Sequence, residues 1–119
     1  MCGIMFFVTS LPYFDHLAIK LVFAENQEID KLFVSSLLEK IVEVLNLKVV
    51  QEVDHDFPGG GLTRVLVLSQ SHLICHTWPE NNFIHLDLMT CSEGLRFDSL
   101  RPIIELFSPK SILIQELKY

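Results

Sequence analysis

The sequence predicts an α+β fold, a two-layer sandwich in which a mostly antiparallel sheet carries two helices on one face. Three observations predict it. The chain has 119 residues, of which 50% are hydrophobic, so it can form one domain with a buried core. Short β-type segments joined by turn-length connections dominate, as in consecutive hairpins. Only two segments show helical periodicity.

Six segments are rich in apolar residues and are bounded by turn residues, which predicts strands. In chain order they are His16–Phe23, Leu47–Val53, Leu62–Leu68, Leu73–Trp78, Phe83–Met89 and Ser111–Leu117. A loop is expected over residues 54–61. Its glycine run predicts a turn and not a phosphate-binding loop, because no Lys-Ser/Thr pair follows it.

Two segments predict helices. Asp30 suits an N-cap, and the apolar residues after it recur three and four apart, which predicts an amphipathic helix over about 30–46. Those apolar residues are Leu32, Phe33, Leu37, Leu38, Ile41, Val42 and Leu45. A second helix is expected from Asp98 or Ser99 to about Phe107, with Pro102 tolerated in its first turn. The high apolar content favours a homodimer in which a second copy covers the sheet face without helices.

Composition excludes several classes of partner. Nine basic and fifteen acidic residues give a net charge of −6 without any Lys/Arg cluster, which argues against nucleic acid. The apolar runs are shorter than the ~20 residues of a membrane-spanning helix, so no membrane partner is expected. The first residues lack the basic region and cleavage site of a signal peptide. Three cysteines are an odd and sparse count, which favours a reducing cytoplasm over a disulfide framework.

Polar residues interrupt the apolar pattern between Ser71 and Glu80. If this segment pairs as a hairpin with the next strand, Cys91 at the end of that strand lies close to Ser71. A hydrolytic site, with Ser71 or Cys91 as nucleophile and His76 as base, stays open, although no Gly-x-Ser-x-Gly elbow is present. An ordinary sheet in which these groups only satisfy hydrogen bonds also stays open.

A metal site in the same segment is disfavoured. His72 and His76, with Cys75 and Cys91, are residue types that bind zinc. The two histidines converge on one ion only if the segment is a helix. In a strand they lie ~13 Å apart. We therefore expect no metal.

The run Ser71–Glu80, SHLICHTWPE, resembles the signature of the small prokaryotic S-adenosylmethionine decarboxylases. Asp87–Cys91 resembles the next block of that family, and His55–Gly61 resembles its His-x-Phe loop. The resemblance covers about residues 15–119 as one domain. Residues 1–14 are then expected to form an N-terminal extension.

The resemblance implies a proenzyme that makes its own cofactor. Ser71 attacks the carbonyl of Gln70, and cleavage between them leaves a pyruvoyl group on residue 71 and two chains of 70 and 49 residues. The pyruvoyl ketone forms a Schiff base with the substrate amine and takes up the electrons released as CO₂ leaves. The implied reaction is decarboxylation of S-adenosylmethionine, which supplies the aminopropyl donor for spermidine synthesis.

The same resemblance implies roles for five further residues. His76 is the base of the ester elimination. Cys91 is the general acid of decarboxylation, because a thiol with a pKa near ~8.5 is mostly protonated at neutral pH. Thr63 takes the place of a serine that assists processing. Phe57 matches an aromatic residue that stacks on adenine, and Glu80 matches a carboxylate that binds the ribose hydroxyls.

Two positions depart from the family's pattern. Gln70 replaces the glutamate before the processing serine, and the glycines at 59–61 replace Pro-Gln-Gly. The changed loop leaves open a pyruvoyl-dependent decarboxylase of a basic amino acid, such as ornithine or arginine. A homologue that is never cleaved and is not an enzyme also stays open.

Overall fold

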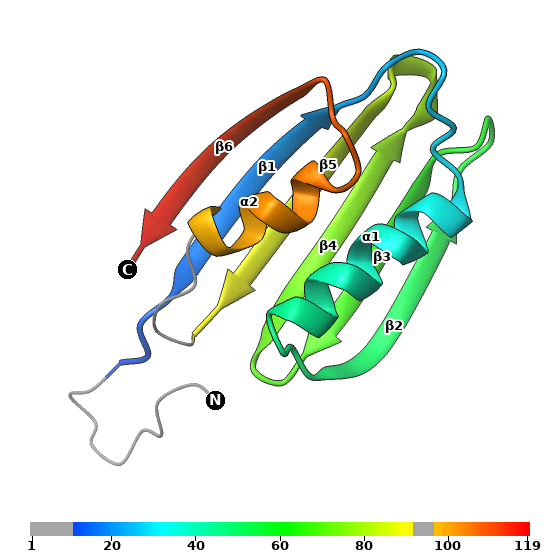
Figure 1. The fold of residues 1–119 in the computed structure, drawn as a ribbon. Helices are drawn as coiled ribbons and strands as arrows, with labels where there is room; N and C mark the ends of the chain where they lie inside the picture. Colours follow the sequence, from blue (N-terminus) through cyan, green and yellow to red (C-terminus); the bar gives the residue numbers. More distant parts are fainter. Residues whose placement is uncertain (1–10, 92–96) are drawn as a thin grey trace.

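A computed structural model describes residues 11–91 and 97–119. Residues 1–10 of the expected N-terminal extension, Cys2 among them, lie outside the described residues. The order of elements along the chain is the predicted one (Figure 1). The elements are β1 (Asp15–Val22), α1 (Lys31–Val44), β2 (Val49–Asp56), β3 (Leu62–Leu68), β4 (Ser71–Trp78), the 3-10 turn η1 (Pro79–Asn81), β5 (Phe83–Thr90), α2 (Phe97–Glu105) and β6 (Ser111–Lys118).

The strands form one sheet in the order β2-β3-β4-β5-β1-β6. Every pairing in the described part of the chain is antiparallel. Both helices lie on the same face of this sheet (Figure 1). The predicted fold class is therefore confirmed.

The core lies between the sheet and the helices. In the central strands every second residue points toward the helices, so that Leu17, Leu73 and Leu86 are completely or almost completely buried. Burying a leucine of this kind contributes about 1.5–3 kcal/mol relative to leaving it exposed. Leu32 does not belong to the core as the periodicity predicts. It is 78% exposed, and Val34 faces the sheet instead.

One predicted boundary is confirmed and two differ. The Asp30 side chain accepts a hydrogen bond from the Phe33 amide at 2.9 Å, which confirms the N-cap of α1. Strand β2 continues to Asp56, because the residues expected in a loop pair with β3. Helix α2 begins at Phe97, so Pro102 lies inside the helix and not in its first turn; it lacks the amide that the ladder needs there.

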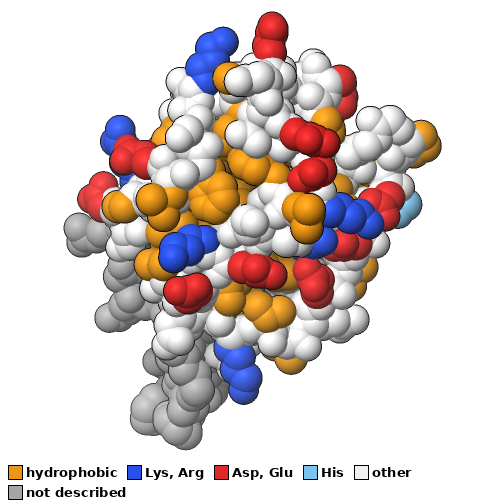
Figure 2. Space-filling view, turned by 45° about the vertical axis from the view of Figure 1, so that its right-hand side comes forward, with side chains coloured by type: hydrophobic (Ala, Val, Ile, Leu, Met, Phe, Trp, Pro, Cys, Tyr) orange, Lys and Arg blue, Asp and Glu red, His pale blue; other side chains and the backbone are white. Residues whose placement is uncertain are grey.

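In the described part of the chain, no helix lies over the other face of the sheet (Figure 1). All five histidines of the chain lie on this uncovered face. Several large hydrophobic side chains accompany them and are 40–60% exposed: Val53, Val67, Trp78, Leu113 and Leu117. Figure 2, turned by 45° about the vertical axis from Figure 1, shows acidic and basic side chains interspersed around hydrophobic ones.

Among the described residues, neither α1 nor α2 has the length and apolar character to cross a membrane.

Candidate active site

The tight turn between β3 and β4 holds the expected cleavage site. Leu68 and Ser71 form the last paired positions of the two strands, so Ser69 and Gln70 make the turn. Gln70 has a φ of 67°, in the left-handed region that residues other than glycine rarely occupy. The Ser71 hydroxyl donates a long hydrogen bond of 3.5 Å to the Ser69 carbonyl. The Gln70–Ser71 bond therefore follows a strained residue at the tip of a hairpin.

Cys91 lies against this turn. Strand β5 returns antiparallel to β4 and brings its end back to the start of β4. The Cys91 sulfur lies 3.6 Å from the carbonyl oxygen of Gln70, and the side chain is buried. The expectation that the hairpin brings Cys91 close to Ser71 is confirmed.

Thr63 and His76 form a pair at the other end of the sheet. They are direct cross-strand partners on β3 and β4. Thr63 Oγ1 lies 2.8 Å from His76 Nδ1, and the direction of this hydrogen bond depends on the histidine tautomer. Both side chains are partly buried on the uncovered face. The threonine therefore orients the imidazole and leaves its Nε2 atom for other contacts.

A pocket of about 270 Å³ lies next to this pair. Its lining consists of Phe57, Pro58, Gly61, Thr63, His76, Thr77, Trp78 and Glu80. The pocket thus combines aromatic surfaces with the carboxylate of exposed Glu80 and with the imidazole of His76. Phe57 is half exposed and its ring contacts the ring of His55 edge-on, with centroids 4.6 Å apart.

The glycine loop after Phe57 has a defined conformation. The Phe57 amide donates to the Gly61 carbonyl at 2.8 Å, and the Gly60 amide donates to the Phe57 carbonyl at 3.2 Å. Gly59 and Gly60 have φ values of 95° and 99°, which only glycine adopts without strain. The departure from the family's loop sequence therefore gives a closed, hydrogen-bonded turn beside the pocket.

Within one chain, the expected site residues form two separate groups. Gln70, Ser71 and Cys91 lie at one end of β4. His76 is five residues further along that strand, which is roughly 16 Å at the rise of an extended chain. The structure therefore joins Cys91 to the turn and Thr63 to His76, but it does not join Ser71 to His76 within one chain.

Two further residues have environments that affect their chemistry. Burial raises the pKa of the Cys75 thiol to about 12, which fits the core position expected for it. Burial and the neighbouring His76 lower the pKa of His85 below its ordinary value. His85 pairs across the sheet with His76 on one side and Lys20 on the other. A row of three nitrogen-containing side chains therefore crosses this face.

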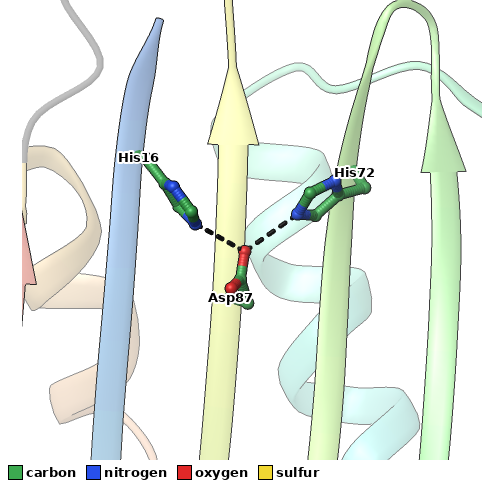
Figure 3. A group of neighbouring side chains, drawn as sticks. All are labelled: His16, His72 and Asp87. Carbon is green, nitrogen blue, oxygen red and sulfur yellow. Dashed lines mark hydrogen bonds and ion pairs between the residues drawn. The ribbon is translucent and has the colours of Figure 1, made fainter. Parts of the chain in front are cut away.

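Sequence reasoning missed a second cluster on the same face. His16, Asp87 and His72 come from β1, β5 and β4, and both imidazoles point toward one carboxylate oxygen (Figure 3). Burial favours the neutral carboxyl, but hydrogen bonds from His72 and His16 outweigh it, and the pKa of Asp87 lies below its ordinary value. Only the register of three strands brings these residues together, so no local motif announces them.

Comparison with known proteins places the chain in a family. A family model described as S-adenosylmethionine decarboxylase matches residues 15–118. The chain belongs to the S-adenosylmethionine decarboxylase family. The family match covers both ends of β4 and the pocket.

Individual members of the S-adenosylmethionine decarboxylase family show the same relationship. The S-adenosylmethionine decarboxylase proenzyme of Methanococcus maripaludis strain C5 is 30% identical over 105 residues, which cover 87% of this chain and 86% of the relative. The proenzyme of Clostridium botulinum strain Langeland is 37% identical over 67 residues. That match spans only 56% of each chain, just over half of the Clostridium relative.

A solved structure from this family has the same fold. The crystal structure of the adenosylmethionine decarboxylase from Aquifex aeolicus VF5 superposes with a TM-score of 0.76. The two chains are 25% identical, and the superposition covers 91% of each.

Proposed function

We propose that this chain is a pyruvoyl-dependent S-adenosylmethionine decarboxylase, made as a proenzyme that cleaves itself between Gln70 and Ser71. The contact between the Cys91 sulfur and the Gln70 carbonyl carries the proposal, because it joins the expected acid to the expected scissile bond. The left-handed φ of Gln70 adds strain at that bond, and cleavage relieves it.

Cleavage proceeds through the hydroxyl of Ser71. Its Oγ attacks the carbonyl carbon of Gln70; the C–N bond breaks, the nitrogen of residue 71 takes up a proton, and an ester forms. A base then removes the α-proton of residue 71, and the Cβ–O bond breaks to release the Gln70 carboxylate. The resulting enamine is hydrolysed: water supplies the ketone oxygen, the nitrogen leaves as ammonia, and the pyruvoyl group remains. His76 supplies the base, and Thr63 holds its imidazole.

Two protomers supply the two halves of this site. Within one chain His76 lies roughly 16 Å from Ser71 along β4, too far for proton transfer. The uncovered sheet face carries exposed hydrophobic side chains, as a face packed on a second copy does. We therefore place a homodimer interface on this face, with each active site built from both copies.

The geometry of such a dimer follows from the strand directions. A two-fold axis between the two faces, running across the strands, reverses the strand direction in the second copy. With the axis near Ile74, halfway between Ser71 and His76, the Ser71 end of one β4 faces the His76 end of the other. Packed sheets lie ~10 Å apart. In the alternation of β4, Ser71 falls on the helix side with Leu73 and Cys75, so residue 71 must turn toward the partner to meet His76.

The pocket beside His76 binds the substrate in this arrangement. Phe57 stacks on the adenine, and Glu80 accepts hydrogen bonds from the ribose hydroxyls. The pyruvoyl carbonyl supplies the electron acceptor for loss of CO₂. Cys91 is disulfide-bonded in this structure, so it returns a proton to the substrate carbon only after that bond is reduced, as in a reducing cytoplasm.

A substrate comparison tests the activity. Purified wild-type protein is incubated, with a reducing agent, with carboxyl-labelled S-adenosylmethionine, ornithine or arginine, and released CO₂ is counted. Release from S-adenosylmethionine alone is the expected result. Release from ornithine or arginine instead would assign the pocket to a basic amino acid. No release from any of the three would contradict the proposal.

A further inference from the structure

The cluster of His16, Asp87 and His72 takes no part in the proposed reaction. It lies on the uncovered face of the sheet, on three neighbouring strands. None of the three residues lines the pocket beside His76. In a single protomer the side chains are 24%, 28% and 31% exposed in the same order, and in the proposed dimer the second copy faces them.

Strand register fixes the geometry of the cluster. His16 on β1 and His72 on β4 both pair with Met89, which lies between them on β5. Asp87 is two residues along β5 and points to the same face. Both imidazoles therefore reach diagonally across one strand to the same carboxylate, a distance that long side chains span.

Three ligand-type atoms converge at this point (Figure 3). His16 Nε2 lies 2.9 Å and His72 Nε2 lies 2.8 Å from the same oxygen, Oδ1 of Asp87. All three atoms lie within 4.8 Å of one another. An ionised carboxylate only accepts hydrogen bonds, so each imidazole donates from Nε2 in this state.

We propose that His16, His72 and Asp87 bind one divalent first-row transition-metal ion, with Zn²⁺ as its reference probe. Two imidazole nitrogens and one carboxylate oxygen are a ligand set that such ions take in proteins. To bind, each neutral imidazole takes the tautomer with its proton on Nδ1, so that the Nε2 lone pairs and a carboxylate oxygen hold the ion. Bonds of about 2.0–2.2 Å require the two rings to move closer together, which side-chain rotation provides.

The side of the cluster that faces away from its own sheet completes the coordination. Three protein ligands leave at least one position for water or for a group from a second molecule. The ion links β4, β5 and β1 across the middle of the sheet. Its expected effect is therefore added stability of the sheet, since binding to the folded state alone raises the unfolding free energy.

Equilibrium dialysis of the full-length protein against Zn²⁺, followed by metal analysis, tests the site. The wild type is expected to bind one ion per chain and to melt at a higher temperature with Zn²⁺. His16→Gln and His72→Gln should each weaken binding at least about tenfold, since even indirect supports of a metal site cost that much. His55→Gln is the matched control, because His55 lies on the same face away from the cluster.

Two further variants keep the test decisive. Cys91→Ser should bind as the wild type does, which excludes a thiol site. If the glutamine variants do not fold, as judged by circular dichroism, Asp87→Asn takes their place. Less than one ion per chain in the wild type would overturn the proposal. So would equal binding by wild type and folded cluster variants. Both results concern binding alone, so they stand whether or not the protein is a decarboxylase.

Discussion

The sulfur of Cys91 lies 3.6 Å from the carbonyl oxygen of Gln70, although the two residues are 21 positions apart in sequence. Two hairpins produce this contact, because β3, β4 and β5 are consecutive antiparallel neighbours. The proposed cleavage breaks the C–N bond between that carbonyl carbon and the nitrogen of Ser71. Cys91 is thus positioned beside residue 71, where the proposed electron acceptor forms.

Replacing Cys91 separates cleavage from turnover. In Cys91→Ala we expect self-cleavage to continue, because the attacking hydroxyl belongs to Ser71. CO₂ release from S-adenosylmethionine should fall by about 10²-fold or more, the usual contribution of a positioned acid. Cys75→Ala is the control: Cys75 is completely buried, so its loss should lower the melting temperature and leave turnover per folded molecule unchanged. Full-rate turnover in Cys91→Ala would show that another group donates the proton.

Mixed dimers test whether two chains share one site. Ser71→Ala and His76→Ala should each remain uncleaved when expressed alone. Coexpressed, they form heterodimers in which one site combines Ser71 of the His76→Ala chain with His76 of the Ser71→Ala chain. We expect cleavage of the His76→Ala chain only, measured by mass spectrometry of the two differently tagged chains. No cleavage in the mixture would place the complete site within a single chain.

The pocket beside His76 is tested through substrate affinity. Phe57→Ala removes the exposed aromatic surface of the pocket, and stacking on a base contributes ~1–3 kcal/mol. We expect KM for S-adenosylmethionine to rise about tenfold, with self-cleavage unchanged and kcat much less affected. Leu32→Ala removes a similarly exposed hydrophobic side chain on α1 and should change neither constant. An unchanged KM in Phe57→Ala would show that the adenine binds elsewhere.

The Asp54–Arg64 pair predicts a pH-dependent contribution to stability. Arg64 is buried and donates from Nε and Nη2 to the two carboxylate oxygens of Asp54, at 2.7 and 2.8 Å. These hydrogen bonds lower the pKa of Asp54 below its ordinary value. The ionised form is therefore stabilised in the folded state. Its contribution is complete above the unfolded-state pKa near ~4 and is lost as the pH falls through the lower folded-state pKa.

Urea denaturation of Asp54→Asn measures this contribution. Near neutral pH we expect the unfolding free energy to drop by about 1–2 kcal/mol, after allowing for screening of the partly exposed carboxylate. Near pH 2 the variant and the wild type should differ little. Asp56→Asn is the matched control, because the Asp56–Lys31 pair is exposed and contributes less than about 1 kcal/mol. A pH-independent difference for Asp54→Asn would show that ionisation is not its cause.

Local signals in the sequence predict much of the fold. The spacing of apolar residues and the Asp30 cap locate α1, and turn residues separate the strands of the consecutive hairpins. Hairpin topology also predicts the approach of Cys91 to the β3–β4 turn. Leu32 is misassigned because it satisfies helical spacing at the edge of the apolar stripe, where only the sheet's position decides burial.

Relations across several strands are what the sequence does not reveal. The His16–Asp87–His72 cluster depends on the order of β1, β5 and β4, because β1 enters the sheet beside β5, far from it in sequence. The separation of Ser71 from His76, by contrast, follows from the rise of a single strand and is predictable from the sequence. Its consequence, a site shared by two copies, depends on a sheet face that only the three-dimensional arrangement shows to be uncovered.

Intact-mass spectrometry of the purified wild-type protein tests self-cleavage directly. We expect two chains, residues 1–70 and residues 71–119, with a pyruvoyl group at the start of the second. We also expect Ser71→Ala to stay whole. A single wild-type species with the 13.7 kDa mass of the intact chain would contradict self-cleavage and, with it, the proposed cofactor.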